Sequence, residues 1–399
     1  ADRPVWLGRV DGHAGWANSR ALAAAGVTVL TKAPAGGSIE RLKDGRPAGV
    51  LVDNATELVD RAVPAPRPED RDLALAKAQE ILLARGVTAI ADMGTTIEDW
   101  QAFRRAGDNG GLRVRIMSYA MGTYNMALIG GPGPSPWLYD DKLRLNGVKL
   151  YADGALGSRG ASLKAPYSDA PTTKGLRVTA DTQLKNFISR AALDRFQVAI
   201  HAIGDEANAA ALTAIEEMNQ TYTGDRRWRI EHAQILDPAD IPRFAKAGVI
   251  ASMQPVHETS DRLMAEARLG PNRLSGAYAW ASLAASGAKL AFGSDVPVEI
   301  SDPWAGFAAA ISRIGPDGQP FGGWQPQERV SRELALAAYT ANGAWAGFAE
   351  GRFGRLQRGE RADFLLIDRD PMLATPAEIR GTQVMQVWIG GRLVHQRGN

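Results

Sequence analysis

Short apolar runs alternate with longer amphipathic stretches along most of the chain, from Glu69 onward. The short runs are apolar nearly throughout, as expected for strands that are buried on both faces of a parallel sheet. The longer stretches repeat apolar residues at helical spacing; one of them is Arg71–Arg85, and Gly86 ends it. Strands that alternate with helices in this way predict an α/β fold with a parallel sheet.

Counting from Gly86, the pattern predicts seven such strands. They are Gly86–Asp92, Leu112–Ala120, Val148–Ala152, Gln197–Ile203, Trp228–Ala233, Gly248–Met253 and Ala288–Gly293. Helices are predicted at Thr96–Ala106, Asp181–Asp194, Glu206–Met218, Pro238–Ala247, Tyr278–Ser286 and Arg332–Ala346. A closed α/β barrel has eight strands, so the expected fold is a (β/α)8 barrel of the TIM type whose first strand is absent from this chain.

The two ends of the chain do not show this alternation of strands and helices. In residues 1–69, Pro4–Val10 is compatible with a strand and Asn18 with the cap of a short helix, while glycines and prolines are frequent from Pro34 to Pro68. We therefore expect residues 1–69 to be an inserted cap or loop region, followed by a barrel over residues 70–353. Residues 354–399 contain two predicted strands, Asp363–Asp368 and Gln386–Val394, and form a small β unit.

The charge balance and the amino-acid composition exclude some classes of binding partner and of bonding. The chain has 399 residues, with 46 lysines and arginines against 44 acids and a formal net charge of +2. This balance argues against nucleic acid or an anionic membrane surface as a partner. The absence of cysteine excludes disulfides and thiolate metal sites, and no run of about 18 apolar residues suggests a membrane span. A homo-oligomer and a cytoplasmic or periplasmic location stay open.

Lys149 lies in the middle of the predicted strand Val148–Ala152, which contains no acidic residue. A buried, unpaired ammonium is costly. Either the side chain reaches solvent with its charged end, or the amine has reacted with carbon dioxide to give a carbamate whose oxygens bridge two metal ions. The second interpretation requires histidines and an acid at the ends of later strands.

Such residues are present at the ends of three later strands. His201 and His232 end two successive strands, and Asp295 follows the last one. Each alone is more typical of a hydrogen-bonded core residue or a turn. Together they are notable, because the chain has only five histidines and the carboxyl ends of barrel strands carry the chemistry of this fold. Imidazole and carboxylate ligands suit zinc and similar divalent ions.

These motifs resemble the amidohydrolase superfamily, and within it amidohydrolase family 3, the YtcJ-like proteins related to N-substituted formamide deformylases. The resemblance covers nearly the whole chain. It is carried by Asp11–Asn18, Val148–Ser158, His201–Asp205, Glu231–Ala233, Gln254–His257, Gly293–Asp295 and Gly354–Asp368. The last of these segments is similar to the closing part of the superfamily's β-sandwich, which implies that residues 354–399 are the C-terminal part of such a sandwich.

The resemblance implies a hydrolase that cleaves a C–N bond of a small amide-type substrate with a metal-bridging hydroxide. Lys149 would be the carboxylated bridging ligand, a catalytic group that depends on carbon dioxide. His201 and His232 would bind the second metal, and Asp295 would bind the first metal and act as general base. The implied cofactor is two Zn²⁺ per site.

One family feature is missing, the His-x-His pair at the end of the first barrel strand. We therefore expect the sequence to be a fragment of a longer protein. Two alternatives stay open: a catalytically degenerate small-molecule binder, and a mononuclear variant with ester hydrolase, lyase or isomerase activity. A His-x-His pair ahead of Ala1 would favour the enzyme over the binder.

Six further residues are candidates for substrate binding. They are His13, Trp16, Asn18, Ser158, Arg159 and His257. The first three lie in the N-terminal insert, where a helix cap beside a packed tryptophan explains them equally well. We expect His257 to lie on a loop after the sixth of the seven predicted strands.

Overall fold

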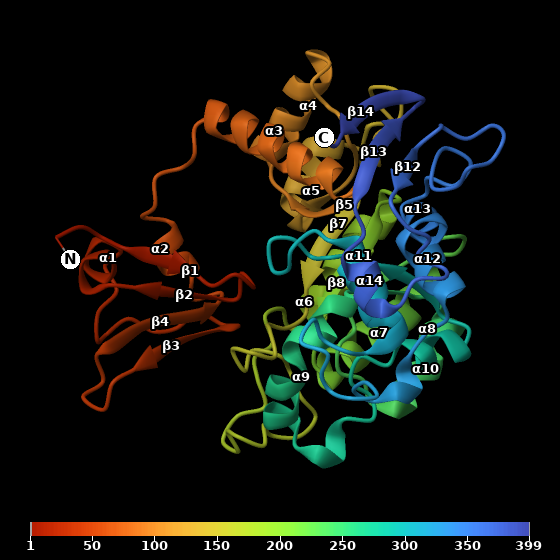
Figure 1. The fold of residues 1–399 in the computed structure, drawn as a ribbon. Helices are drawn as coiled ribbons and strands as arrows, with labels where there is room; N and C mark the ends of the chain where they lie inside the picture. Colours follow the sequence, from red (N-terminus) through yellow and green to blue (C-terminus); the bar gives the residue numbers. More distant parts are fainter. Residues whose placement is uncertain (1, 399) are drawn as a thin grey trace.

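The computed structural model describes residues 2–398, whose strands form three separate sheets (Figure 1). A seven-stranded sheet lies at the centre, a four-stranded sheet holds the N-terminal residues, and a three-stranded sheet holds the C-terminal ones. In Figure 1 the N-terminal sheet stands to one side of the central body, and the C-terminal sheet lies against its upper part near α3.

The central sheet is parallel and its strands follow one another in sequence order. The strands are β5 (Ala89–Thr95), β6 (Arg115–Met121), β7 (Leu143–Tyr151), β8 (Gln197–Ala202), β9 (Arg229–His232), β10 (Ile250–Met253) and β11 (Lys289–Phe292). This curled seven-stranded sheet confirms the incomplete barrel expected from the sequence. Most strand residues from β6 to β10 are buried, because helices cover one face and the curl of the sheet encloses the other.

Helices connect the strands and pack on the sheet. They are α3 (Pro68–Ala84), α4 (Ile97–Asp108), α5 (Gly122–Gly130), α6 (Asp181–Leu193), α7 (Asp205–Thr221), α8 (Ile241–Ala247), α9 (Pro255–Leu269), α10 (Trp280–Ala285), α11 (Pro303–Ser312), α12 (Arg332–Tyr339) and α13 (Ala341–Ala346). The sequence did not predict α5, α9 or α11. The helix expected at Arg332–Ala346 is divided at Thr340, whose backbone is not helical.

The N-terminal residues form more regular structure than the expected loop region. Strands β1 (Trp6–Gly8), β2 (Ala14–Ala17), β3 (Gly37–Arg41) and β4 (Pro47–Asp53) pair antiparallel in the order β1-β2-β4-β3. Two short helices, α1 (Ser19–Ala24) and α2 (Glu57–Asp60), complete this unit. Asn18 caps α1 as predicted: its side-chain oxygen accepts a hydrogen bond from the Ala21 amide at 2.9 Å.

The C-terminal sheet consists of β12 (Phe364–Ile367), β13 (Val384–Ile389) and β14 (Arg392–Gln396), with α14 (Pro376–Arg380) between the first two strands. All pairings are antiparallel, and the Gly390–Gly391 turn joins β13 to β14, which divides the predicted stretch Gln386–Val394. A buried ion pair ties this sheet to the barrel: Arg115 of β6 binds Asp363 through Nε at 2.6 Å and Nη2 at 2.7 Å. Within residues 2–398 no helix combines the length and apolar character needed to cross a bilayer.

Candidate metal centre

The carboxyl ends of the central strands gather the polar residues that the sequence singled out. Tyr151 of β7 pairs with His201 of β8, and Ala202 of β8 pairs with His232 of β9. Neighbouring parallel strands therefore bring the two histidines to the same edge of the sheet. His201 and His232 are both buried, and their ring centroids lie 4.7 Å apart.

His257 and Asp295 join this cluster from the following two connections. His257 lies in the first turn of α9, after β10, and not on a loop as the sequence suggested. Ligand atoms of His232, His257 and Asp295 all lie within 4.8 Å of one another, and Nε2 of His257 is 3.8 Å from Oδ2 of Asp295. Two imidazoles and a carboxylate at this spacing fit the ligand set of a divalent transition metal.

Two glutamine side chains orient the histidines of this group. Nδ1 of His232 lies 2.8 Å from Oε1 of Gln254 and donates to it, which leaves Nε2 free to accept. Nε2 of the Gln234 amide lies 3.1 Å from Nδ1 of His257 and fixes the position of that ring. A contact such as that of His232 with Gln254 holds a metal-binding histidine in the required tautomer.

A buried atom without a partner supports the fit of these residues to a metal. Nε2 of His257 is buried and makes no hydrogen bond within the described residues. A buried polar atom left unsatisfied costs roughly 1–3 kcal/mol. A cation bound between His232, His257 and Asp295 would give this nitrogen a partner, so the residues present fit a metal ion.

His201 is anchored through its other nitrogen. Its Nε2 lies 3.4 Å from the Gly154 carbonyl and 3.6 Å from Oδ1 of Asp153, so that Nδ1 remains as an acceptor. Asp153 is fully buried and accepts backbone hydrogen bonds from Ser162, Ile203 and Gly204. Burial raises the pKa of Asp153 to about 7, against the effect of these backbone donors.

Burial favours the neutral form of two of the imidazoles, those of His201 and His232. Burial, followed by the positive charges of neighbouring groups, lowers the pKa of His201 well below its usual value. Burial also lowers the pKa of His232 to about 4, although the Asp295 charge opposes this shift. Neutral rings are the form that binds metal. Burial raises the pKa of Asp295, but the charges of His232, His257 and Lys149 outweigh burial and hold it below the usual value.

Lys149 lies in β7 and is buried, so its charged end does not reach solvent. Its Nζ is 5.0 Å from the centroid of the Tyr151 ring, and no carboxylate of the described residues forms an ion pair with it. Its charge lowers the pKa of His201, His232 and Asp295, which places the ammonium near the cluster. The carboxylation of Lys149 stays a prediction.

Two residues of the cluster have a backbone conformation that is uncommon for their type. His232 has φ +78° and Asp295 has φ +57°. Non-glycine residues in this region carry strain of roughly 1–3 kcal/mol, and such residues concentrate at functional sites. The surrounding structure therefore holds both residues in place against this backbone strain.

The N-terminal sheet also reaches the cluster. His13 immediately precedes β2, and its ring centroid lies 4.8 Å from that of His201. Its Nδ1 is 2.7 Å from Oδ1 of Asp53, the last residue of β4. The sequence pattern indicates His13 as a candidate but not Asp53, because the two residues are 40 positions apart and no local pattern links them.

The other predicted substrate residues do not meet the cluster. Trp16 is 62% exposed on β2, and Asn18 caps α1. The Ser158 hydroxyl donates to the Ala155 carbonyl at 3.2 Å. Arg159 pairs with Asp169 at 2.8 Å.

A cavity of about 170 Å³ lies over the cluster. His13, His201, His232, His257 and Asp295 line it together with residues of mixed character. The remaining lining residues are Arg9, Val10, Asp11, Ala155, Leu156, Gly157, Ile203, Gln234, Asp261, Met264, Val298 and Glu299. The lining carries more acids than bases, which suits a small neutral or cationic molecule better than an anion.

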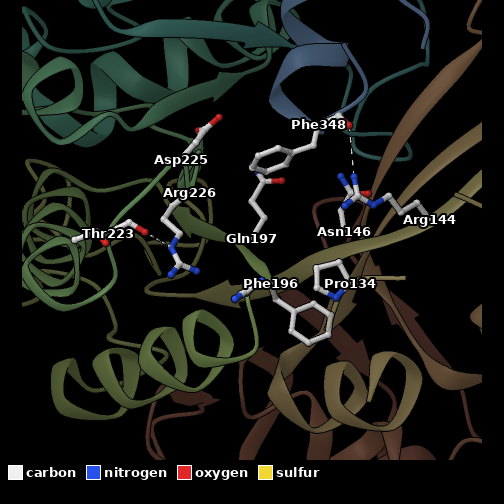
Figure 2. A pocket seen from close by; sticks show the side chains of 10 residues that line it. Pro134, Arg144, Asn146, Phe196, Gln197, Thr223, Asp225, Arg226 and Phe348 are labelled. Atoms are coloured by element: carbon white, nitrogen blue, oxygen red, sulfur yellow. Dashed lines mark hydrogen bonds between the residues drawn. The ribbon is translucent and has the colours of Figure 1, made fainter. Parts of the chain in front are cut away.

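A larger cavity of about 390 Å³ lies at the opposite end of the sheet (Figure 2). Arg144 and Asn146 of β7 and Gln197 of β8 line it, and these residues lie near the amino ends of their strands. In Figure 2 Arg226 and Arg144 flank Gln197 from opposite sides. No histidine lines this cavity, so the candidate chemistry belongs to the carboxyl-end cluster.

Comparison with known proteins agrees with this geometry. A model of the amidohydrolase family matches residues 1–395. Protein LONG AFTER FAR-RED 3 of Arabidopsis thaliana is 37% identical over 98% of this chain and 69% of its own length. The putative amidohydrolase YtcJ of Bacillus subtilis is 33% identical, over 99% of this chain and 75% of its own.

Two further proteins extend the comparison. The N-substituted formamide deformylase of Arthrobacter pascens is 27% identical over 99% of this chain and 74% of its own length. The crystal structure of an uncharacterized metal-dependent hydrolase from Pyrococcus horikoshii superimposes with a TM-score of 0.78 at 28% identity, covering 94% of this chain and 73% of that one.

Proposed function

Since the chain belongs to the amidohydrolase family, we propose that it is a metal-dependent hydrolase that cleaves the carbon–nitrogen bond of a small amide. The resemblance to the YtcJ-like branch that the sequence suggested is confirmed by its relatives. The hydrolase class agrees with the metal-dependent hydrolase of similar structure.

The observation that supports the proposal most directly is the convergence of His232, His257 and Asp295, with ligand atoms within 4.8 Å of one another. These three residues would hold a divalent ion, and His201 and Lys149 lie beside them. A bound divalent ion lowers the pKa of a coordinated water and polarises a substrate carbonyl. In the fuller form that the family resemblance implies, a carboxylated Lys149, His201 and His232 would hold a second zinc ion beside the first.

The chain's own residues would move the proton. The Asp295 carboxylate takes a proton from the attacking water as the new carbon–oxygen bond forms. It then gives that proton to the leaving nitrogen as the carbon–nitrogen bond breaks, so that the products are a carboxylic acid and an amine. The lowered pKa of Asp295 keeps this group ionised and ready to accept the proton at neutral pH.

The C–N bond is preferred over an ester because of the relatives. One of them carries the name N-substituted formamide deformylase and another the name putative amidohydrolase. The cavity of about 170 Å³ limits the substrate to a small molecule. Small N-formyl and N-acyl amines are therefore the substrates to test first.

The test uses the 399-residue chain loaded with Zn²⁺ and a panel of small N-formyl amines, N-acyl amines and matching esters. We expect release of amine that stops when a chelator removes the metal. Asp295→Asn should lower kcat by on the order of 10²–10⁴, while metal stays bound as measured by elemental analysis. Full activity of this variant would refute the role of Asp295.

A second variant tests the metal group. His257→Asn should weaken metal affinity at least on the order of 10–100-fold, because it removes one of the three convergent ligands. The matched control is His395→Asn, since His395 lies in β14 of the C-terminal sheet and should bind metal and turn over as the parent does. A metal-loaded parent that hydrolyses neither amides nor esters would favour the degenerate small-molecule binder.

A further inference from the structure

The N-terminal sheet inserts a histidine and a carboxylate into the edge of the metal cluster, and both are held firmly. The backbone amide of Asp53 donates to the His13 carbonyl at 2.9 Å, and the His13 amide donates to Oδ1 of Asp11 at 3.1 Å. The side-chain contact between Nδ1 of His13 and Oδ1 of Asp53 is 2.7 Å. The pair is therefore fixed both along the backbone and through its side chains.

The buried position and the left-handed backbone of Asp53 are both energetically unfavourable, and its contact with His13 gives a reason for them. Its side chain is only 2% exposed, and its Oδ2 is buried without a hydrogen-bond partner among residues 2–398. Its φ is +48°, in the left-handed region. The carboxylate packs against Gly154 and Gly160 of the loop after β7, where any side chain at either glycine would overlap it. The one hydrogen bond that the carboxylate makes in the described chain is to His13.

This contact decides which nitrogen of His13 faces the cavity as an acceptor. The Asp53 carboxylate accepts the Nδ1 proton, so in the neutral ring Nε2 carries a lone pair. His13 lines the cavity beside His201, and its Nε2 makes no hydrogen bond within the described residues. An acceptor in this position pairs with an N–H or O–H donor of a bound molecule.

We propose that Asp53 is a positioning residue that holds His13 in the Nδ1–H tautomer, and that His13 then accepts a hydrogen bond from the amide N–H of the substrate. This inference rests on the proposed amidohydrolase function and deepens it, because it names a substrate class. The enzyme selects primary and secondary amides, which have an N–H, over N,N-disubstituted amides and esters, which lack one. Selection of this kind is strong because an analogue without the donor leaves a buried acceptor unpaired.

The first experiment measures the tautomer and does not depend on turnover. Long-range ¹H–¹⁵N NMR of the His13 ring, at a pH at which the ring is neutral, should show the proton on Nδ1. In Asp53→Asn the amide can turn its N–H₂ group to Nδ1, and the ring should change to the Nε2–H tautomer. A parent ring with its proton on Nε2 would overturn the proposal.

The second experiment compares a secondary amide with its N-methyl tertiary analogue. The parent should prefer the secondary amide at least tenfold in kcat/KM, and Asp53→Asn should lose that preference through a lower kcat/KM for the secondary amide alone. Asp60→Asn is the matched control, because Asp60 accepts from Nε1 of Trp6 at 2.8 Å in the same N-terminal unit and does not line the cavity. Unchanged discrimination in Asp53→Asn would contradict the proposal.

A double variant separates positioning from folding. In a His13→Gln background, Asp53→Asn should change the preference no further, since its effect passes through His13. Additive losses would mean that Asp53 acts only on the stability of the sheet, and would overturn the proposal. If the metal-loaded chain hydrolyses no amide at all, the proposed function fails, whereas the NMR measurement still decides whether Asp53 sets the His13 tautomer.

Discussion

Two adjacent residues of α9 have opposite environments. His257 extends toward Asp295 in the metal cluster, while Glu258 is completely buried and neither of its carboxylate oxygens has a hydrogen-bond partner within the described residues. The Arg313 guanidinium is buried nearby and attracts this carboxylate, but the two side chains form no ion pair. The effect of burial is larger than the effect of this attraction, and it raises the pKa of Glu258 from 4.5 to about 7.

Because of this raised pKa, Glu258 lowers the stability of the folded protein in a pH-dependent way. Because the folded-state pKa lies above the unfolded value, ionisation opposes folding: the penalty is absent below about pH 4.5 and is complete above about pH 7. At about 1.4 kcal/mol per pKa unit, the penalty reaches about 3 kcal/mol. Glu258→Gln keeps the shape of the side chain and cannot ionise, so its free energy of unfolding should exceed that of the parent by up to this amount at pH 8.

Urea unfolding at pH 4.5 and pH 8 checks this prediction, with equal stabilities of the two proteins expected at the lower pH. Glu98→Gln on the exposed face of α4 is the control and should differ from the parent by less than about 0.5 kcal/mol at either pH. A Glu258→Gln variant that is less stable than the parent at pH 8 would show that the ionised carboxylate is needed by Arg313.

At the scale of elements, the order of the strands explains why much of the site was predictable. A parallel sheet places every strand's carboxyl end at one edge, so the sequence alone predicts that His201, His232 and Asp295 lie close together. The helices α9 and α11 were not predicted; each begins with a proline, which favours the first turn of a helix but is also frequent in loops. His257 was accordingly assigned to a loop and to substrate.

The connection between β8 and α7 is tightly packed at Gly204. Gly204 is the N-cap of α7, and a side chain there would overlap the Ser162 carbonyl. Its amide also donates to Oδ2 of Asp153 at 2.9 Å. Gly204→Ala should therefore destabilise the protein by roughly 1–3 kcal/mol, the usual cost of overpacking. Its φ of −75° excludes backbone strain as the cause.

The matched control is Gly293→Ala. Gly293 also follows a barrel strand, but a Cβ there meets no atom within 4 Å. Its change in unfolding free energy should stay within about 0.5 kcal/mol of zero, as measured by urea titration of both variants. Equal effects of the two substitutions would mean that the loop at Ser162 moves aside freely.

At the scale of the molecule, the contacts between sheets are what the sequence did not reveal. The seven-stranded sheet and the small C-terminal β unit follow from local patterns, because most of their strands lie in short, mainly apolar runs of the sequence. The β3–β4 hairpin was obscured by frequent glycine and proline, and the contact of Asp53 with His13 arises from the pairing of β2 with β4. The pair meets His201 only because the N-terminal sheet packs on the central sheet and on the loop after β7. Long-range packing of this kind has no periodicity from which it can be inferred.

A buried charge contact joins the C-terminal sheet to the barrel beside their shared apolar core, and that contact can be tested. The Arg115 side chain is 1% exposed and that of Asp363 6%. Asp363 also accepts from the Gly390 amide at 2.8 Å, and Arg115 donates to the carbonyls of Asp140 and Asp141. Asp363→Ala leaves a buried guanidinium without its carboxylate, which should cost about 3–5 kcal/mol.

Removing both charges should cost less than the sum of the single losses, because an apolar pair leaves no buried charge unpaired. We therefore expect Arg115→Met with Asp363→Leu to be more stable than Asp363→Ala alone. Hydrogen exchange of the β13 amides locates the effect, since a sheet that loosens from the barrel exchanges before the central strands do. Glu57→Ala breaks an exposed pair with Arg61 at 2.9 Å and should cost less than about 1 kcal/mol. If Asp363→Ala costs no more than this control, apolar packing rather than the ion pair joins the C-terminal sheet to the barrel.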